Sequence, residues 1–204
     1  MKASIMIGLI VVLLGGVIGY LFISQEPITN YPPKNRTIVA FGDSLVYGQG
    51  ATKGNDFVSQ LSTKLGRDII NLGVSGNTTS DGLLRVDEVL KEDPGTVILL
   101  LGGNDYLRQI PKEETEKNLE TLIKTFEDSG AVVVLLGVRG GVLKDGREEM
   151  YEALSKKYKT VYVQDVLEGV FLKPELMSDG IHPNDKGYTI IANRLFEVFQ
   201  EKKL

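Results

Sequence analysis

The chain contains a single histidine, His182, which lies in a polar segment three residues after Asp179. Far upstream, Ser44 follows a short apolar run and stands two residues after Gly42. A serine hydroxyl becomes a strong nucleophile when an imidazole takes its proton and a carboxylate orients that imidazole. The residue types therefore predict nucleophilic attack on a carbonyl carbon, with Ser44 as nucleophile, His182 as base and Asp179 as the partner of the base.

Each of these features also has an ordinary explanation when taken alone. A Gly-Asp-Ser sequence at the end of a strand is usually just a turn, in which the polar side chains bind nearby amides. A lone histidine in a polar loop is more often a surface residue than a base. One histidine with scattered carboxylates is also a poor set of zinc ligands, so we expect no metal and no other cofactor.

Two further segments contain candidate donors for the negative charge that develops on a carbonyl oxygen during attack. They contain Gly76 and Asn104. The backbone amides of Ser44 and Gly76 and the side-chain amide of Asn104 are predicted to form an oxyanion hole. Asp43 and Asp105 are instead expected to be structural carboxylates that accept hydrogen bonds from neighbouring amides.

Short apolar runs alternate with amphipathic segments from residue 37 onward. The runs predicted as strands are 37–41, 68–72, 96–101, 131–136 and 160–163, and the segments predicted as helices are 56–65, 79–90, 112–128, 147–158 and 185–202. The alternation predicts an α/β fold in which a five-stranded parallel sheet lies between helix layers, with every strand buried on both faces. Ser44, Gly76 and Asn104 follow the first three strands, at the sheet edge where such folds bind ligands.

The amino terminus has a different composition, because residues 5–23 form an unbroken apolar run. About 20 apolar residues can span a bilayer as a helix, whereas a cleaved signal has a shorter apolar part and ends in small residues. The run ends instead in the bulky residues 20–23, and Lys2 favours a cytoplasmic amino terminus. We expect residues 1–24 to be a membrane anchor, 25–36 a linker and 37–204 one domain outside the cytoplasm. The alternative is a cleaved signal and a secreted or periplasmic domain.

The overall composition excludes several classes of protein. The 204 residues are enough for one domain with a substantial core. The net charge is −4 and the cationic residues are interspersed with acidic ones, so no nucleic-acid partner is expected. The absence of cysteine excludes disulfides and thiolate metal sites.

The order of these motifs resembles that of the GDSL, or SGNH, hydrolase family. The matching blocks are Phe41-Gly42-Asp43-Ser44-Leu45, Gly76, Gly103-Asn104-Asp105 and Asp179-Gly180-Ile181-His182-Pro183-Asn184. The chain looks most similar to the bacterial group of acyl-CoA thioesterases, lysophospholipases and arylesterases, which Leu172-Lys173-Pro174 also resembles. The resemblance implies a flavodoxin-like three-layer α/β/α sandwich and the same five site residues: Ser44, Gly76, Asn104, Asp179 and His182.

The substrate class that this resemblance implies is an acyl ester, a thioester or a lysophospholipid. Tyr106, Leu107, Ile110, Val142 and Leu143 are expected to line an acyl-binding groove. The alternative enzyme is a carbohydrate O-acetyl esterase, for which these loops offer only one aromatic platform, Tyr106. A membrane-tethered binding module without activity is a third interpretation, which the complete set of catalytic residue types disfavours.

Overall fold

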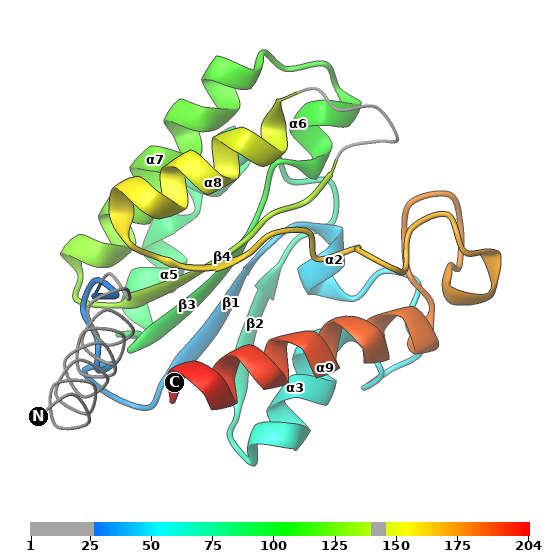
Figure 1. Ribbon diagram of the computed structural model, residues 1–204, viewed down its shortest axis with the longest axis horizontal. Helices are drawn as coiled ribbons and strands as arrows, with labels where there is room; N and C mark the ends of the chain where they lie inside the picture. Colours follow the sequence, from blue (N-terminus) through cyan, green and yellow to red (C-terminus); the bar gives the residue numbers. More distant parts are fainter. Residues whose placement is uncertain (1–26, 140–145) are drawn as a thin grey trace, which may run out of the picture.

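The computed structural model describes residues 27–139 and 146–204, in which five parallel strands form one sheet in the order β2-β1-β3-β4-β5. The strands are β1 (Ile38–Gly42), β2 (Ile69–Gly73), β3 (Thr96–Leu100), β4 (Val132–Leu136) and β5 (Val161–Val163). Figure 1 shows the sheet running through the molecule with its strands side by side. The predicted strands agree with these to within one residue at each end.

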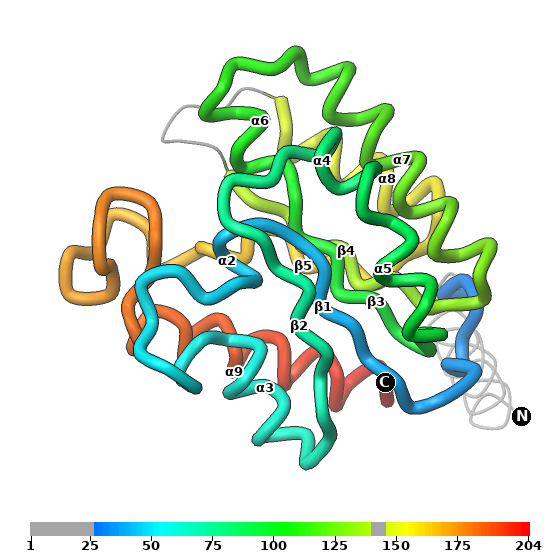
Figure 2. Tube along the Cα trace, turned by 180° about the vertical axis from the view of Figure 1, so that it is seen from behind, coloured from blue at the N-terminus to red at the C-terminus, as the bar shows by residue number. Residues whose placement is uncertain are grey.

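Helices cover both faces of the sheet and make it the middle of three layers (Figures 1 and 2). One face carries α3 (Phe57–Leu65) and α9 (Asp185–Lys202), and the other carries α4 (Thr79–Leu84), α5 (Val86–Lys91), α7 (Lys112–Asp128) and α8 (Arg147–Tyr158). Three single-turn elements, α2 (Ser44–Tyr47), α6 (Gly103–Leu107) and the 3₁₀ helix η1 (Pro174–Leu176), lie in loops. The predicted three-layer α/β/α sandwich is confirmed.

The segment predicted as one helix over residues 79–90 is two helices, because the backbone leaves helical geometry at Arg85, where φ is −114°. The Arg85 guanidinium donates to Asn77 Oδ1 at 2.8 Å and to the Leu72 carbonyl at 3.1 Å. The bend between α4 and α5 therefore lies at the residue whose side chain is hydrogen-bonded to the end of β2. The spacing of apolar residues does not predict such a hydrogen bond between elements.

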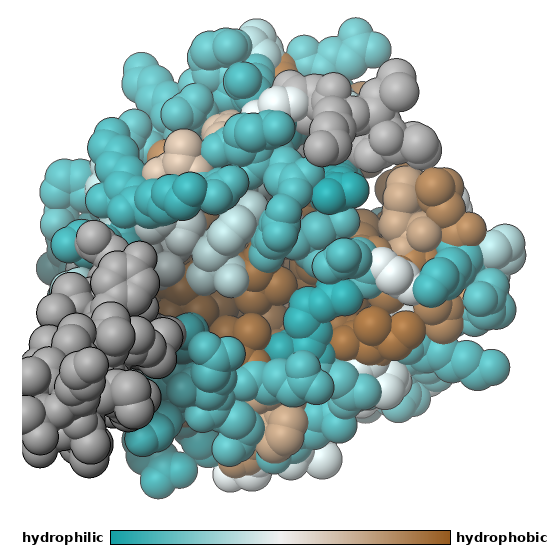
Figure 3. Space-filling model, in the orientation of Figure 1, coloured by the Kyte–Doolittle hydropathy of each residue, from teal (hydrophilic) through white to brown (hydrophobic). Residues whose placement is uncertain are grey.

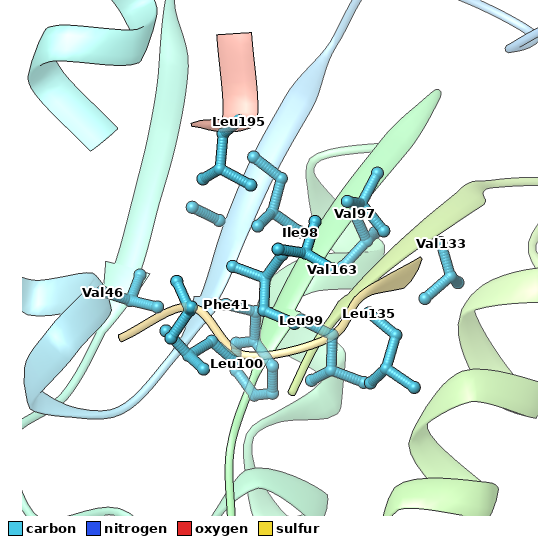
Figure 4. Packing of buried hydrophobic residues seen from close by; sticks show 14 of the residues in the cluster. Phe41, Val46, Val97, Ile98, Leu99, Leu100, Val133, Leu135, Val163 and Leu195 are labelled. Atoms are coloured by element: carbon cyan, nitrogen blue, oxygen red, sulfur yellow. The ribbon is translucent and has the colours of Figure 1, made fainter. Parts of the chain in front are cut away.

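Packing around the three central strands forms the core. Every residue of β1, β3 and β4 is buried, and Figure 4 shows side chains of these strands gathered near Val46 of α2 and Leu195 of α9. The rings of Phe41 and Phe126 meet edge to face with centroids 5.8 Å apart. The prediction that all strands are buried is wrong for the two edge strands, which have a neighbour on one side only: no residue of β2 is buried, and Tyr162 of β5 is partly exposed.

Residues 27–36 are attached to the end of the sheet at which the strands begin. The Thr29 amide donates to the Lys159 carbonyl at 3.2 Å, and Asn30 Nδ2 donates to the carbonyls of Glu127 at 2.7 Å and Ala131 at 3.0 Å. Ala131 directly precedes β4, and Lys159 lies two residues before β5. This segment therefore lies at the amino edge of the sheet, opposite the edge where the strands end (Figure 1).

The described ranges contain no helix that is both long enough and apolar enough to cross a bilayer. The membrane segment predicted for residues 1–24 lies outside those ranges.

Candidate active site

Ser44 begins the short helix α2 at the carboxyl end of β1. Gly42 makes this abrupt turn possible, since a Cβ atom there would lie 2.2 Å from the Leu100 carbonyl oxygen and 2.5 Å from a Val46 methyl group. Asp43 caps the helix by accepting the Leu45 amide at 3.0 Å. The serine is thus held half-buried at the sheet edge, with its side chain free to meet another loop.

The structure brings the three predicted catalytic side chains into one hydrogen-bonded line. His182 Nε2 lies 3.0 Å from Ser44 Oγ, and His182 Nδ1 lies 2.7 Å from Asp179 Oδ2. Ser44 and His182 are 138 positions apart in the sequence. Because a carboxylate only accepts hydrogen bonds, the Nδ1 atom carries the proton and Nε2 is the acceptor facing the serine hydroxyl.

The carboxylate of Asp179 is held by its own loop as well as by the imidazole. Its Oδ1 accepts the amides of Ile181 and His182, both at 2.8 Å. Burial acts to raise the pKa of Asp179, but the hydrogen bonds from the His182 ring and from these two amides outweigh it and lower the pKa to about 2. Asp179 is therefore negatively charged at neutral pH, and it can stabilise a positively charged imidazole.

The loop that carries His182 is fixed at both of its ends. Met177 and Pro183 form an isolated antiparallel bridge, and the Ser178 amide donates to the His182 carbonyl at 2.8 Å. Asn184 then caps α9 by accepting the amides of Lys186 and Gly187. Helix α9 and this bridge together position the imidazole over the end of β1.

The three predicted oxyanion donors come from three different strand ends. Among the described residues, no acceptor takes the backbone N–H of Ser44 or of Gly76. Gly76 has φ of +84°, a conformation that glycine adopts readily. Asn104, in α6, donates through Nδ2 to the Asn77 carbonyl at 3.0 Å and lies 3.4 Å from Asp43 Oδ2.

Asp43 and Asp105 make the contacts expected of structural carboxylates. Asp43 is only 3% exposed, and this burial raises its pKa to about 7 in spite of the hydrogen bond from Leu45 and the neighbouring His182. Asp105 is fully buried and accepts both the backbone amide of Thr79 at 2.9 Å and its hydroxyl at 2.5 Å. Asp43 is part of the described pocket lining, whereas Asp105 is not.

A pocket opens above Ser44 and His182. Its polar lining consists of Asp43, Ser44, Gly103, Asn104, Arg139 and His182, and its apolar lining of Leu45, Leu107, Val138, Leu167, Phe171 and Ile181. The apolar surface continues outward over the projecting segment between β5 and α9, where Leu172 is 65% exposed and Ile181 42% exposed (Figure 3). An elongated apolar group can therefore lie in the pocket with its end beside the serine hydroxyl.

Of the residues predicted to line the acyl groove, only some line the pocket in the part of the chain that the structure describes. Leu107 lines the pocket. Tyr106 and Ile110 are absent from its described lining, and the Tyr106 ring faces the guanidinium of Arg147 at 5.8 Å. Val142 and Leu143 lie outside the described residues, so their role stays a prediction.

Most of the apolar side chains that line the pocket are not among the residues predicted for the acyl groove. Leu167 and Phe171 belong to the irregular segment between β5 and η1, and Val138 follows β4. The available signal in the sequence is the run of apolar residues in an irregular segment close to the catalytic loop. Loops are mostly polar and exposed, so apolar side chains there indicate a binding surface. Within the described residues, no group of three or more histidine or acidic side chains could hold a metal ion.

A serine hydroxyl, an imidazole and a carboxylate in line at the carboxyl edge of a parallel sheet define a serine hydrolase. Residues 40–190 match the GDSL-like Lipase/Acylhydrolase family, and the chain belongs to this family.

Relatives support the same assignment. The chain is 34% identical to the arylesterase of Vibrio mimicus, over 76% of this chain and 84% of the relative. It is 30% identical to the thioesterase 1/protease 1/lysophospholipase L1 of Escherichia coli, over 80% of this chain and 83% of the relative. The crystal structure of TesA superposes with a TM-score of 0.76 at 28% identity, covering 82% of this chain and 99% of TesA. The protein is an ester-bond hydrolase with an SGNH-hydrolase fold.

Proposed function

We propose that Ser44 is the nucleophile, His182 the general base and Asp179 the residue that orients the base. In the first half of the reaction, Ser44 Oγ bonds to the acyl carbon while its proton moves to His182 Nε2. The tetrahedral oxyanion is held by the amides of Ser44 and Gly76 and by Asn104 Nδ2. It then collapses, the bond to the leaving alcohol or thiol breaks, and His182 returns the proton to that leaving group.

The second half of the reaction repeats these steps with water. His182 takes a proton from the water molecule as its oxygen bonds to the acyl carbon, and the resulting intermediate releases the carboxylic acid and Ser44. The observation that carries the proposal is the pair of short contacts at the two ring nitrogens of His182, 3.0 Å to Ser44 and 2.7 Å to Asp179.

A pre-steady-state assay with a short p-nitrophenyl ester tests these roles. The wild-type enzyme should release a burst of p-nitrophenol as the acyl-enzyme forms, and Ser44→Ala should abolish the burst and the covalent label left by a fluorophosphonate. Ser129→Ala is the matched control, because Ser129 follows α7, lies outside the described pocket lining and donates from its hydroxyl to the Phe126 carbonyl. A burst that survives in Ser44→Ala would mean that another residue is the nucleophile.

We propose that the acyl group is an apolar chain of an ester, a thioester or a lysophospholipid. Six apolar side chains line the pocket beside Ser44, and burying each methylene group of an acyl chain there contributes about 0.8 kcal/mol. The named relatives include an arylesterase and a thioesterase/lysophospholipase. The alternative is an O-acetyl esterase for polysaccharides, and a sugar ring would need aromatic stacking that Phe171 alone offers among the described lining residues.

A substrate series separates the two substrate classes. The ratio kcat/KM should rise from p-nitrophenyl acetate to p-nitrophenyl octanoate, because the longer chain fills the apolar pocket. Activity highest on the acetate, together with deacetylation of acetylated xylan, would favour the polysaccharide esterase.

We further propose that residues 1–24 anchor the protein in a membrane, that 25–36 are a linker and that 37–204 form the catalytic domain outside the cytoplasm. The support is the apolar run of residues 5–23 and the position of Lys2 before it. A retained anchor predicts that the full chain stays in the membrane fraction after alkaline carbonate extraction. Recovery of a shortened chain in the soluble fraction would indicate a cleaved signal.

A further inference from the structure

Gly76 is the third residue of a turn that the Asn77 amide closes by donating to the Val74 carbonyl at 3.2 Å, and the direction of the Gly76 N–H depends on how firmly this turn is held. Gly76 has no side chain and a φ of +84°, and it lies in the irregular loop between β2 and α4. Glycine has access to more backbone conformations than any other residue, so its own preferences do not fix the direction of its N–H. An oxyanion donor is effective only when its direction is set before the charge develops.

Helix α6 and the residue that follows it hold the turn and the start of α4 through three side chains. Asn104 Nδ2 donates to the Asn77 carbonyl at 3.0 Å, and Asp105 Oδ2 accepts the Thr79 amide at 2.9 Å. Arg108, directly after the helix, donates from Nη2 to the carbonyl of Gly76 itself at 2.8 Å. Residues four apart in a helix share a face, so Asn104 and Arg108 meet the same loop.

The buried part of this arrangement is anchored to other elements. Asp105 Oδ1 accepts the Thr115 hydroxyl at 3.3 Å, and Arg147 Nη1 donates to that hydroxyl oxygen at 2.9 Å. Arg147 also donates to the Ile110 carbonyl at 2.8 Å. The chain of contacts from α8 through α7 to α6 keeps α6 in place while it holds the loop.

Arg108 differs from Asn104 and Asp105 because it is exposed and its contact is to the oxyanion-donor residue itself. We propose that Arg108 is a positioning residue. By holding the Gly76 carbonyl it fixes the peptide group that follows the Gly76 Cα atom and so limits rotation about the Gly76 backbone dihedrals, which keeps the Gly76 N–H of the preceding peptide group pointing at the developing oxyanion. This inference rests on the proposed function, in which Gly76 donates to that oxygen. A hydrogen bond from a charged donor is stronger than a neutral one, which suits a restraint at an exposed site.

The test compares Arg108→Met and Arg108→Lys with the wild-type full chain on a neutral p-nitrophenyl ester. Misplacing one donor should lower kcat by about tenfold in Arg108→Met with KM nearly unchanged, since a neutral substrate makes no ion pair with Arg108. Phenylboronic acid adds to an active-site serine as a tetrahedral anion, so its inhibition constant should rise by the same factor. Arg108→Lys should recover part of both losses, because it keeps a charged donor.

Lys117→Met is the matched control, because it removes one exposed positive charge on α7. Its kcat and its affinity for phenylboronic acid should equal those of the wild type. The thermal unfolding midpoint of Arg108→Met should also stay close to that of the wild type, since Arg108 is exposed.

Two outcomes would overturn the inference. The first is an unchanged kcat in Arg108→Met, and the second is a loss that appears only in KM for anionic esters, which would make Arg108 a substrate-binding residue. Either result would leave the proposed function intact as long as the activity still depends on Ser44. Failure of the proposed function itself would show separately, as activity that survives in Ser44→Ala.

Discussion

Asp43 places a buried carboxyl group between the nucleophile and the oxyanion hole. Its side chain accepts the Leu45 amide and lies 3.4 Å from the amide nitrogen of Asn104. Burial raises the pKa of Asp43 to about 7, well above the ordinary value of 3.8. The cap that it provides to α2 is therefore a charged group only at neutral and alkaline pH.

This raised pKa predicts how stability changes with pH. Between pH 3.8, the ordinary pKa, and about pH 7, the folded protein holds a proton on Asp43 that the unfolded chain releases. The contribution of Asp43 to the free energy of unfolding therefore falls as the pH rises through this range. The loss levels off above about pH 7, where both states have released the proton. Asp43→Asn has no such proton. The free energy of unfolding of Asp43→Asn relative to the wild type should therefore increase from about pH 5 to about pH 8, as measured by urea unfolding. Parallel curves would show that Asp43 does not titrate in this range.

Helix α9 sets the position of the histidine loop by approaching it closely. In its first turn, a Cβ atom on Gly187 would lie 2.3 Å from the Leu176 carbonyl oxygen and 2.8 Å from the Pro183 Cβ. Backbone atoms cannot move aside as a flexible side chain can, so glycine is required for this contact. The distance between α9 and the segment that carries His182 is thus set by the absence of one methyl group.

Gly187→Ala should therefore displace the histidine loop. Overpacking of this kind typically costs about 1–3 kcal/mol, in spite of the better helix propensity of alanine. Turnover on a short p-nitrophenyl ester should fall by about tenfold or more, because a small misplacement of His182 lengthens its contact with Ser44.

Gly180→Ala is the control from the same loop, since a Cβ atom there would have no neighbour within 4 Å. Its kcat and unfolding midpoint should match the wild-type values. A Gly187→Ala enzyme with wild-type stability and turnover would show that the loop adapts without loss.

At the scale of the whole molecule, the linker and the pocket lie at opposite ends of one sheet. Thr29 and Asn30 are bonded at the amino edge, whereas Ser44 and His182 meet at the carboxyl edge (Figure 1). A compact domain of this length is about 40 Å across. The three residues between Ile23 and Pro27 span at most about 11 Å. With residues 5–23 in a membrane as proposed, the pocket would face away from that membrane.

This orientation predicts which esters the anchored enzyme reaches. The full chain in vesicles should hydrolyse a water-soluble ester readily and a lysophospholipid of its own bilayer slowly. Inserting about 30 Gly/Ser residues between Gln25 and Glu26 adds a mean span of about 30 Å. The insertion should speed hydrolysis of that lysophospholipid and leave the rate on the soluble ester unchanged. Equal lipid rates with and without the insertion would contradict the proposed orientation.

The sequence by itself determined the alternation of strands and helices, because buried strands and amphipathic helices have apolar patterns of different period. It also identified Ser44, Asp179 and His182, since a single histidine leaves one candidate base and motif order reveals the family. Their roles stay predictions, which the contacts at the two ring nitrogens of His182 support.

Only the tertiary structure decided the contacts between distant segments. The break at Arg85, the exposed edge of β2, the lining by Leu167 and Phe171 and the hydrogen bond from Arg108 to Gly76 all depend on how separate elements are arranged in space. A periodic pattern records which face of an element is buried, but it does not record which residue of another element meets that face. Those contacts are set by the order of strands in the sheet and by the close approach of backbones, and both exist only once the chain has folded.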